Sequence, residues 1–208
     1  MKVCVIGAGG FIGRNLIKDT DWVPLTRQDV DIMSECDFSE YDVVIHCAAS
    51  IDRQNPKTCY ENILMFENVL KTSKKLIYFS SGAAFLGDPP QEPYGLSKWV
   101  IDKRIETLPN VYSLRIWGCY GPGELPTRFS AVCREKGHVV IQKDRYFDFI
   151  SVMDVKRIVE DYVNGKTTKK FYNLVYDKKM KLSEWATFFG ATHEIVEEEL
   201  DKDYICNN

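Results

Sequence analysis

Three side chains of this sequence are suited to moving a proton: Ser81, Tyr94 and Lys98. Tyr94 and Lys98 are four residues apart at the start of a predicted helix, so they share one of its faces. A tyrosine with an ordinary pKa of about 10 is a poor acid or base at neutral pH. A lysine ammonium one turn away, together with an oxidised nicotinamide, would lower that pKa. Ser81 ends a predicted strand and could hold a substrate oxygen toward the phenol. The set fits proton transfer to or from a carbonyl or alcohol while a hydride moves to or from a dinucleotide.

The first thirteen residues predict where that dinucleotide binds. A short apolar strand over residues 2–6 runs into the glycine turn GAGGFIG and then into a predicted helix over residues 14–19. Glycines let the backbone approach a pyrophosphate, and the start of a helix directs free N–H groups toward it. A glycine turn that only joins strand to helix is the alternative. The motif predicts five cofactor-binding residues: Gly7, Gly10, Phe11, Ile12 and Gly13.

The end of the second predicted strand, residues 22–26, bears on the choice of cofactor. An acidic residue there would bind the ribose hydroxyls of NAD, whereas a nearby arginine suits the extra phosphate of NADP. Arg27 therefore favours NADP, with NAD as the alternative if Arg27 is only a solvated loop residue. Residues 28–41 are few and polar, so we expect an abbreviated third strand and helix. Within them, Asp31 and Ile32 are predicted to contact the cofactor.

Strands and helices alternate through residue 116, which predicts an α/β fold with a Rossmann-like, doubly wound parallel sheet. The further strands are predicted over residues 42–47, 75–79 and 110–116, and the helices over residues 58–72 and 94–108. Small residues after the strand 42–47 would let a flat cofactor lie against the backbone at the carboxyl edge of the sheet. These predicted cofactor contacts are Cys47, Ala48 and Ala49. His46, inside that strand, is interpreted as a core or edge histidine.

The pattern changes beyond residue 120, where short elements mix with loops. Helices are predicted over residues 126–136, 152–163 and 182–189, and strands over residues 138–142 and 170–175. The acidic stretch 194–203 is expected to be a solvated edge. We assign residues 1–120 to a dinucleotide-binding Rossmann core. Residues 121–208 are assigned to a small, trimmed C-terminal substrate lobe of mixed α/β structure, some of whose strands could return to the core.

Bulk properties exclude several classes of protein. A net charge of −3 without a basic stripe argues against nucleic-acid binding. No apolar run is long enough to cross a bilayer, so no membrane partner is expected. The seven cysteines are scattered and form no Cys-x-x-Cys pair, so neither a disulfide framework nor a metal site is predicted. We expect a cytoplasmic protein that acts on a small molecule.

Seven features of the sequence, in order, resemble the extended short-chain dehydrogenase/reductase family, which comprises NAD-dependent nucleotide-sugar epimerases, dehydratases and ketoreductases. They are GAGGFIG, HCAAS, Asn62, SSGAAFLG, YGLSK, LRIWGCYGPG and FDFISVMDV, and the resemblance covers about residues 1 to 190. It implies bound NADP or NAD and a catalytic group of Ser81, Tyr94 and Lys98, the last two also touching the cofactor. It implies that Asn62 is a structural or relay residue behind Lys98, at the cofactor.

The same resemblance implies a nucleotide sugar as substrate. Its contacts would be Ser81, Gly82, Ala83, Tyr94, Arg128 and Arg145. The two arginines could meet a diphosphate, although surface salt bridges are equally compatible with them. The habit of the family also implies a possible homodimer through the helices 58–72 and 94–108.

Departures from the family pattern concern the substrate. Phe85 stands where the family's turn carries a tyrosine, with Leu86 interposed before Gly87. Gly118 stands where many sugar-nucleotide enzymes carry an asparagine. The chain is also short for the family, so the substrate lobe is expected to be trimmed.

Among the chemistries of the family, we favour reduction. A reductase exchanges its cofactor, and Arg27 favours NADP. A dehydratase usually adds an acidic pair beside the catalytic serine, where this chain has Gly82 and Ala83. The sequence therefore predicts NADP-dependent reduction of a keto group on a nucleotide-linked sugar. The alternatives are an epimerase with tightly held NAD, a reductase of small non-nucleotide carbonyls, and a non-catalytic dinucleotide-binding scaffold.

Overall fold

A six-stranded parallel sheet forms the centre of the molecule. The computed structural model describes residues 1–197 and 202–206. The strands are β1 (Val3–Ile6), β2 (Val23–Leu25), β3 (Val43–His46), β4 (Leu76–Ser81), β5 (Val111–Ile116) and β9 (Phe171–Leu174), in the order β2-β1-β3-β4-β5-β9. Every residue of β1, β3 and β4 is buried, as the continuous apolar runs require of strands covered on both faces. The predicted fold class is confirmed.

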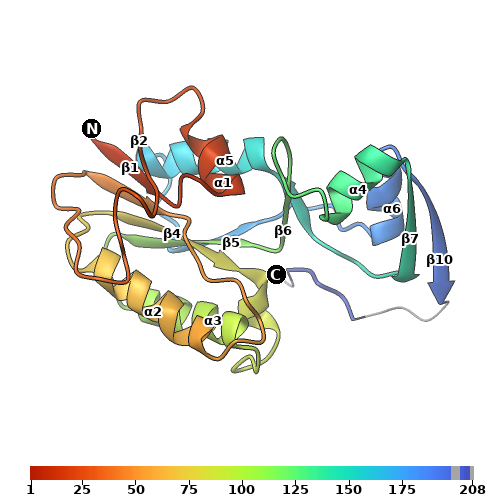
Figure 1. The fold of residues 1–208 in the computed structure, drawn as a ribbon, viewed down its shortest axis with the longest axis horizontal. Helices are drawn as coiled ribbons and strands as arrows, with labels where there is room; N and C mark the ends of the chain where they lie inside the picture. Colours follow the sequence, from red (N-terminus) through yellow and green to blue (C-terminus); the bar gives the residue numbers. More distant parts are fainter. Residues whose placement is uncertain (198–201, 207–208) are drawn as a thin grey trace.

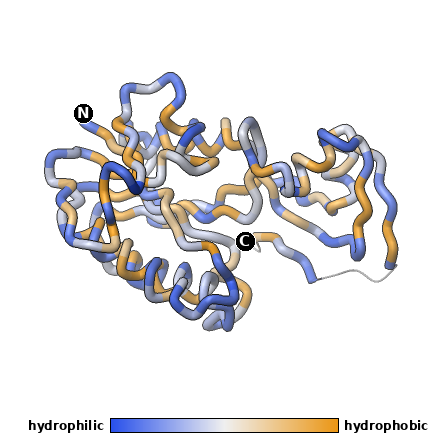
Figure 2. The backbone as a smooth tube through the Cα atoms, in the orientation of Figure 1, coloured by the Kyte–Doolittle hydropathy of each residue, from blue (hydrophilic) through white to orange (hydrophobic). Residues whose placement is uncertain are grey.

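Helices cover both faces of this sheet (Figure 1). On one side lie α1 (Phe11–Ile17) and α5 (Val152–Val163), and on the other α2 (Lys57–Leu70) and α3 (Pro93–Glu106). Successive strand residues point to opposite faces. Val3 and Val5 accordingly pack in the cluster that contains α1 and α5, whereas Cys4 and Ile6 pack in the cluster that contains α2 and α3. In Figure 2, hydrophobic and hydrophilic residues alternate along α2 and α3, as expected of helices with one face on the sheet and one face in solvent.

A smaller lobe extends from one end of the core (Figure 1). It contains α4 (Phe129–Lys136), β7 (His138–Lys143), α6 (Leu182–Phe188) and β10 (Thr192–Glu197), with β7 and β10 paired in parallel. Trp185 and Phe149 are buried in its apolar cluster. The short strands β6 (Gly118–Tyr120) and β8 (Phe149–Ser151) pair where the chain passes between core and lobe.

Two segments assigned to the lobe by sequence lie with the core. Helix α5 packs its buried residues Val155 and Val159 into the cluster under α1, and β9 pairs with β5 in the main sheet. The chain therefore returns to the core after leaving it beyond Cys119, which still packs in the core cluster. Among residues 1–197 and 202–206, no helix is long and apolar enough to cross a membrane.

The predicted third strand is wrong. Residues 28–41 contain turns and no strand, because their polar side chains close local turns. Asp29 accepts hydrogen bonds from the backbone N–H and hydroxyl of Thr26, and Asp31 accepts from the N–H of Met33. Element boundaries also move: α1 begins at Phe11 rather than at residue 14, and α4 at Phe129 rather than at residue 126. In the acidic stretch, residues 194–197 belong to exposed β10, and residues 198–201 lie outside the described residues.

Candidate active site

Ser81, Tyr94 and Lys98 meet at the carboxyl end of β4. Ser81 is the last residue of β4, and its Oγ accepts a hydrogen bond of 3.2 Å from the N–H of Ala83 in the short 3-10 helix η1 (Gly82–Phe85). Tyr94 and Lys98 lie in the first turns of α3, and the Lys98 Nζ is 5.6 Å from the centre of the Tyr94 ring. Burial raises the pKa of Tyr94, while hydrogen bonding by Ser81 lowers it. The three side chains that the sequence predicts to act together therefore lie close to one another.

Lys98 is buried with its ammonium held by β4. Its Nζ donates to the Tyr78 Oη at 2.7 Å and to the Phe79 carbonyl at 2.9 Å. Burial lowers the pKa of Lys98 to about 7, and the charge of Asp102 opposes this shift. Burial raises the pKa of Tyr78 well above its usual range, so Tyr78 stays a neutral acceptor. Sequence analysis missed Tyr78, because a tyrosine inside the apolar run LIYFSS looks like a core residue.

Asn62 lies next to this group without contacting the Lys98 ammonium. Its Nδ2 donates to the Ser50 carbonyl and to the Ser97 Oγ, both at 3.0 Å, and its Oδ1 accepts from the Ser50 N–H at 2.8 Å. Asn62 thus joins α2, the loop after β3 and α3. It supports the backbone at Ser50 and the neighbour of Lys98.

A cavity of about 590 Å³ opens at the carboxyl ends of β1, β2 and β3. Of the predicted cofactor residues, eight line it: Gly7, Gly10, Arg27, Asp31, Ile32, Cys47, Ala48 and Ala49. The other six, Phe11, Ile12, Gly13, Asn62, Tyr94 and Lys98, lie outside its lining. Sequence analysis missed several lining residues, among them Thr26, Val30, Met33, Ser50, Glu61 and Met65. Met33 and Met65 supply apolar surface, as a flat aromatic ligand requires.

Two glycines of the turn are required by close backbone packing. Gly7 has φ +83°, and a Cβ there would lie 2.7 Å from the Ala48 backbone nitrogen. A Cβ at Gly13 would lie 2.8 Å from the Ala8 Cα and would also strike the Gly7 carbonyl oxygen. Only glycine lets β1, the turn and α1 approach one another in this way. The cavity wall is therefore backbone at this point.

Arg27 stands at the rim of the cavity beyond β2. It is exposed, and it makes no ion pair within the part of the chain that the structure describes. The neighbouring carboxylates are engaged elsewhere: Asp29 holds Thr26, and Asp31 accepts from Met33 N–H and Ser34 Oγ, both at 3.0 Å. The Arg27 guanidinium thus lies at the cavity, and the nearby carboxylates of Asp29 and Asp31 accept hydrogen bonds from other residues.

Comparison with known proteins identifies the fold. No family model matches the chain. A dTDP-4-dehydrorhamnose reductase from Bacillus anthracis, solved in complex with NADP, superposes with a TM-score of 0.75 at 18% identity, covering 94% of this chain and 84% of that one. MoeE5, solved with UDP-glucuronic acid and NAD, superposes with a TM-score of 0.70 at 17% identity, covering 98% and 88%. The chain has the extended short-chain dehydrogenase/reductase fold.

A curated protein of Methanocaldococcus jannaschii, provisionally named a UDP-glucose 4-epimerase, is 29% identical over 139 residues. That match covers 54% of this chain and 46% of the relative, so the chain spans less than half the length of the curated relative it matches.

In this extended short-chain dehydrogenase/reductase fold, the two predicted substrate arginines lie in different places. Arg128 precedes α4, with its Nη1 3.4 Å from the Cys119 carbonyl and its guanidinium 5.7 Å from the centre of the Phe11 ring. The charge of Arg128 opposes the rise in the pKa of Tyr94 that burial causes, so Arg128 lies near Tyr94. Arg53, which sequence analysis missed, acts on Tyr94 in the same way and pairs with Glu92 at 3.4 Å.

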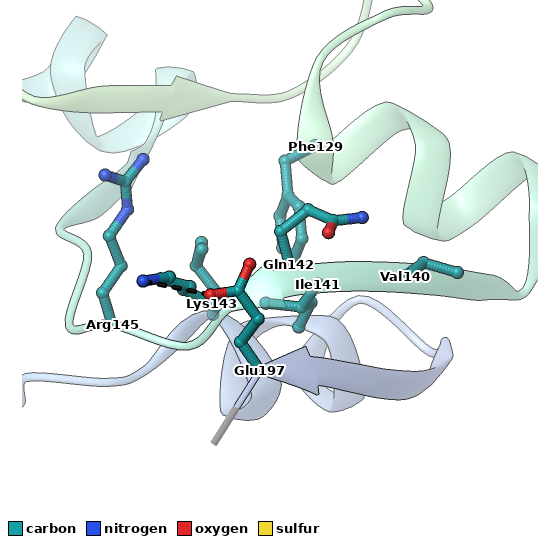
Figure 3. Close-up of a pocket in the computed structure, with 8 residues that line it drawn as sticks. Phe129, Val140, Ile141, Gln142, Lys143, Arg145 and Glu197 are labelled. Atoms are coloured by element: carbon teal, nitrogen blue, oxygen red, sulfur yellow. Dashed lines mark ion pairs between the residues drawn. The ribbon is translucent and has the colours of Figure 1, made fainter. Parts of the chain in front are cut away.

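Arg145 instead lines a cavity of about 450 Å³ in the lobe (Figure 3). Phe129, Val140 and Ile141 form part of the wall, and Lys143 pairs with Glu197 at 3.0 Å across it. Figure 3 shows the Arg145 side chain on the opposite side of the cavity from Val140. Arg128 thus lies near Tyr94, whereas Arg145 lines the lobe cavity, whose wall also includes Phe129, the residue after Arg128.

Two further predicted substrate residues, Gly82 and Ala83, lie in a closely packed part of the chain. Gly82 and Ala83 are buried in η1, and a Cβ at Gly82 would lie 2.5 Å from the indole of Trp117. Phe85 stacks on Trp117 with 5.7 Å between ring centres. Across residues 1–197 and 202–206, no cluster of three His, Cys, Asp or Glu side chains could hold a metal ion.

Proposed function

We propose that the protein binds NADP and reduces a keto group of a nucleotide-linked sugar. The observation that carries this proposal is the convergence of Ser81, Tyr94 and Lys98 at the carboxyl end of β4, in the same sheet edge as the glycine-turn cavity. Ligands of open α/β sheets bind in the crevice at this edge. A scaffold protein would need the cavity but not a buried phenol beside a buried lysine.

When bound, NADPH would supply the hydride for the carbonyl carbon. Tyr94 gives its phenolic proton to the carbonyl oxygen, so the product is an alcohol and the residue is left as a phenolate. Lys98, held by Tyr78 and Phe79, stabilises that phenolate from one turn along α3. Ser81 orients the oxygen toward Tyr94.

The substrate would extend from this group toward the lobe. Gly82 and Ala83 would form the floor under the sugar, and Arg128, near Tyr94, would meet a charged group close to it. Arg145 would meet the far end, in the lobe cavity. An arginine is suited to phosphate because its fork of donors matches two oxygens at once.

Cofactor choice is tested by fluorescence titration of the purified protein with NADPH and NADH. We expect tighter binding of NADPH and, in Arg27→Ala, loss of at least about tenfold in NADPH affinity with little change for NADH, since a charge-assisted phosphate contact is worth roughly 1.5–3 kcal/mol. Arg157→Ala is the matched control, because Arg157 is an exposed arginine on α5. Equal binding of both cofactors by all three proteins would contradict the role of Arg27.

Turnover is tested next with 4-keto nucleotide sugars, following the oxidation of NADPH. We expect Tyr94→Phe to keep NADPH binding and to lose about 10²–10⁴-fold in kcat, the range typical of a proton donor. Absence of turnover in the unmodified protein, with small carbonyls reduced instead, would replace the nucleotide sugar by a smaller substrate. If neither cofactor binds, both enzyme interpretations fail and a scaffold remains.

An epimerase that keeps NAD is the second candidate. The observation in its favour is that carboxylates, Asp31 and Glu61, also line the cavity, where they could accept ribose hydroxyls. Such an enzyme would be purified with NAD that does not exchange. Extraction of the bound nucleotide from the purified protein distinguishes the two.

A further inference from the structure

The register of the main sheet places Tyr78 on the face that α2 and α3 cover. Its register partners are His46 of β3 and Ser113 of β5, and its side chain packs in the cluster that contains α2 and α3. The Phe66 ring of α2 meets the Tyr78 ring edge-on with 5.2 Å between ring centres, and the His46 ring centre lies 5.4 Å away. Tyr78 is buried. Packing on both sides of the ring therefore fixes where the Tyr78 hydroxyl lies.

This hydroxyl is one of two groups of β4 that hold the Lys98 ammonium. A lysine ammonium has three protons to donate. One goes to the Tyr78 Oη at 2.7 Å and a second to the Phe79 carbonyl at 2.9 Å. The ring centre of Tyr94, one helical turn earlier on α3, lies 5.6 Å from the Lys98 Nζ. Strand β4 thus holds the ammonium beside Tyr94 and leaves it one proton for another partner.

Asn62 does not take part in holding the ammonium. The family resemblance implies that Asn62 is a structural or relay residue behind Lys98. A side-chain amide has two protons to donate. Both protons of Asn62 are used, one by the Ser50 carbonyl and one by the Ser97 Oγ. The side chain that meets the Lys98 ammonium is therefore a phenol of β4 and not the amide of α2.

The other titratable groups near Lys98 do not replace this contact. Burial lowers the pKa of His46 to about 3, so His46 carries no charge at neutral pH. Burial raises the pKa of Cys47, just after β3, so Cys47 is a neutral thiol. The charge of Asp102 on α3 favours the ammonium, but its carboxylate accepts its hydrogen bonds from β5. Tyr94, the fourth group, is the proposed proton donor.

We propose that Tyr78 is a positioning residue of the reaction: its hydroxyl accepts a hydrogen bond from the Lys98 ammonium, and so keeps Lys98 charged and beside Tyr94 while Tyr94 gives up its proton. This inference rests on the proposed function and adds to it a residue that acts through Lys98. Without the Tyr78 hydroxyl, one ammonium proton would lose its acceptor in a buried site, which favours the neutral amine. A neutral amine would not stabilise the phenolate of Tyr94.

The test is Tyr78→Phe, which keeps the ring against Phe66 and removes only the hydroxyl. We expect the substitution to lower the pKa of Lys98 from about 7 to about 6, as loss of one hydrogen bond to a charged group would do. The free energy of unfolding, measured by chemical denaturation without cofactor or substrate, should then fall more at about pH 5, where Lys98 is charged, than at about pH 9. In a Lys98→Met background the loss should be the same at both pH values.

The pH dependence of keto-sugar reduction is the second readout. Lowering the pKa of Lys98 to about 6 would reduce the ammonium form about tenfold above pH 7 and only slightly at pH 5. We expect kcat of Tyr78→Phe to be about tenfold below that of the unmodified protein at about pH 8, and within about twofold of it at about pH 5. A loss of purely structural origin would be the same at both pH values, and that result would overturn the proposal.

Tyr162→Phe is the matched control, because Tyr162 is a buried tyrosine of α5 whose hydroxyl donates to the Lys169 carbonyl at 2.8 Å. It should lower the free energy of unfolding equally at both pH values and leave the pH profile of kcat unchanged. Equal destabilisation by Tyr78→Phe at about pH 5 and about pH 9 would overturn the proposal. Absence of turnover with every keto sugar would overturn the proposed function, while the denaturation experiment would still decide whether Tyr78 keeps Lys98 charged.

Discussion

Lys98 combines a proposed chemical role with an energetic cost. Its ammonium has two neutral acceptors, Tyr78 and the Phe79 carbonyl, and no carboxylate among the hydrogen-bond partners within the described residues. Burial therefore dominates and brings the pKa of Lys98 to about 7. A lysine this close to neutrality can respond to a change of charge on Tyr94, as proton transfer there requires.

The shifted pKa of Lys98 predicts a pH-dependent stability. The folded protein releases this proton at about pH 7, whereas the unfolded chain holds it up to the ordinary value of 10.5. Between these values the unfolded state binds more protons, so the Lys98 contribution makes the free energy of unfolding rise with pH from about 7 to about 10.5. Below about pH 7 both states hold the proton, and this contribution no longer changes with pH. Lys98→Met should remove this rise.

Chemical denaturation from about pH 7 to about pH 10 measures the effect. Lys103→Met, which removes an exposed lysine from the same helix, is the control and should keep the slope of the unmodified protein. Parallel pH profiles for the unmodified protein and Lys98→Met would contradict the prediction.

At the scale of elements, the β1–turn–α1 unit depends on the absence of side chains at particular positions. Gly7→Ala would place a methyl group against the Ala48 backbone on a residue whose φ is +83°. Strain of this kind costs about 1–3 kcal/mol. We expect Gly7→Ala to lower the free energy of unfolding by this amount and to weaken NADPH binding, as measured by denaturation and titration.

Gly9→Ala is the control within the same turn. A Cβ at Gly9 meets only the Thr26 Cγ2, at 3.9 Å, which is ordinary contact. This variant should keep the stability of the unmodified protein. Equal destabilisation by both substitutions would mean that the glycine content of the turn, rather than the approach of Gly7 to the Ala48 backbone, determines its stability.

The β1–turn–α1 unit and the helical pair of Tyr94 and Lys98 were predictable because their signals are local. The strand, the glycine turn and the four-residue spacing of Tyr94 and Lys98 each lie within a few consecutive residues. The absence of a strand in residues 28–41 was not predicted. The sequence shows Asp29 and Asp31 only as polar residues, and their turn contacts become visible in the structure. Tyr78 was missed since its partner, Lys98, belongs to another element.

At the scale of the whole molecule, Asp148 joins three separate segments. Its buried carboxylate accepts from Lys179 and from the Cys206 backbone, while its own N–H donates to the Tyr204 carbonyl. Tyr204 is 57 residues from Phe147, so no local pattern could have predicted their pairing. Contacts of this range were beyond sequence analysis.

We predict that Asp148→Asn loosens residues 202–206 while leaving the main sheet intact. Removing the charge of buried Asp148 should destabilise the structure locally, because the Lys179 ammonium then lacks its counter-charge. Hydrogen exchange should become faster in peptides containing residues 202–206 and 146–148 and stay unchanged in those containing β1, β3 and β4. Asp161→Asn, at an exposed pair with Lys166, is the control. Unchanged exchange in residues 202–206 would refute this role of Asp148.

The lack of a strand beyond β2 also affects how one molecule meets another. Within the described residues β2 is an edge of the main sheet, and a free edge can pair with a strand of a second chain. Leu25 directs its carbonyl to the Gly7 N–H, so the residue before it, exposed Pro24, has its backbone nitrogen on the outer side. A proline nitrogen carries no hydrogen to donate. In a strand of three residues, Pro24 therefore keeps the sheet from being extended by a neighbouring molecule, and so opposes aggregation through this edge.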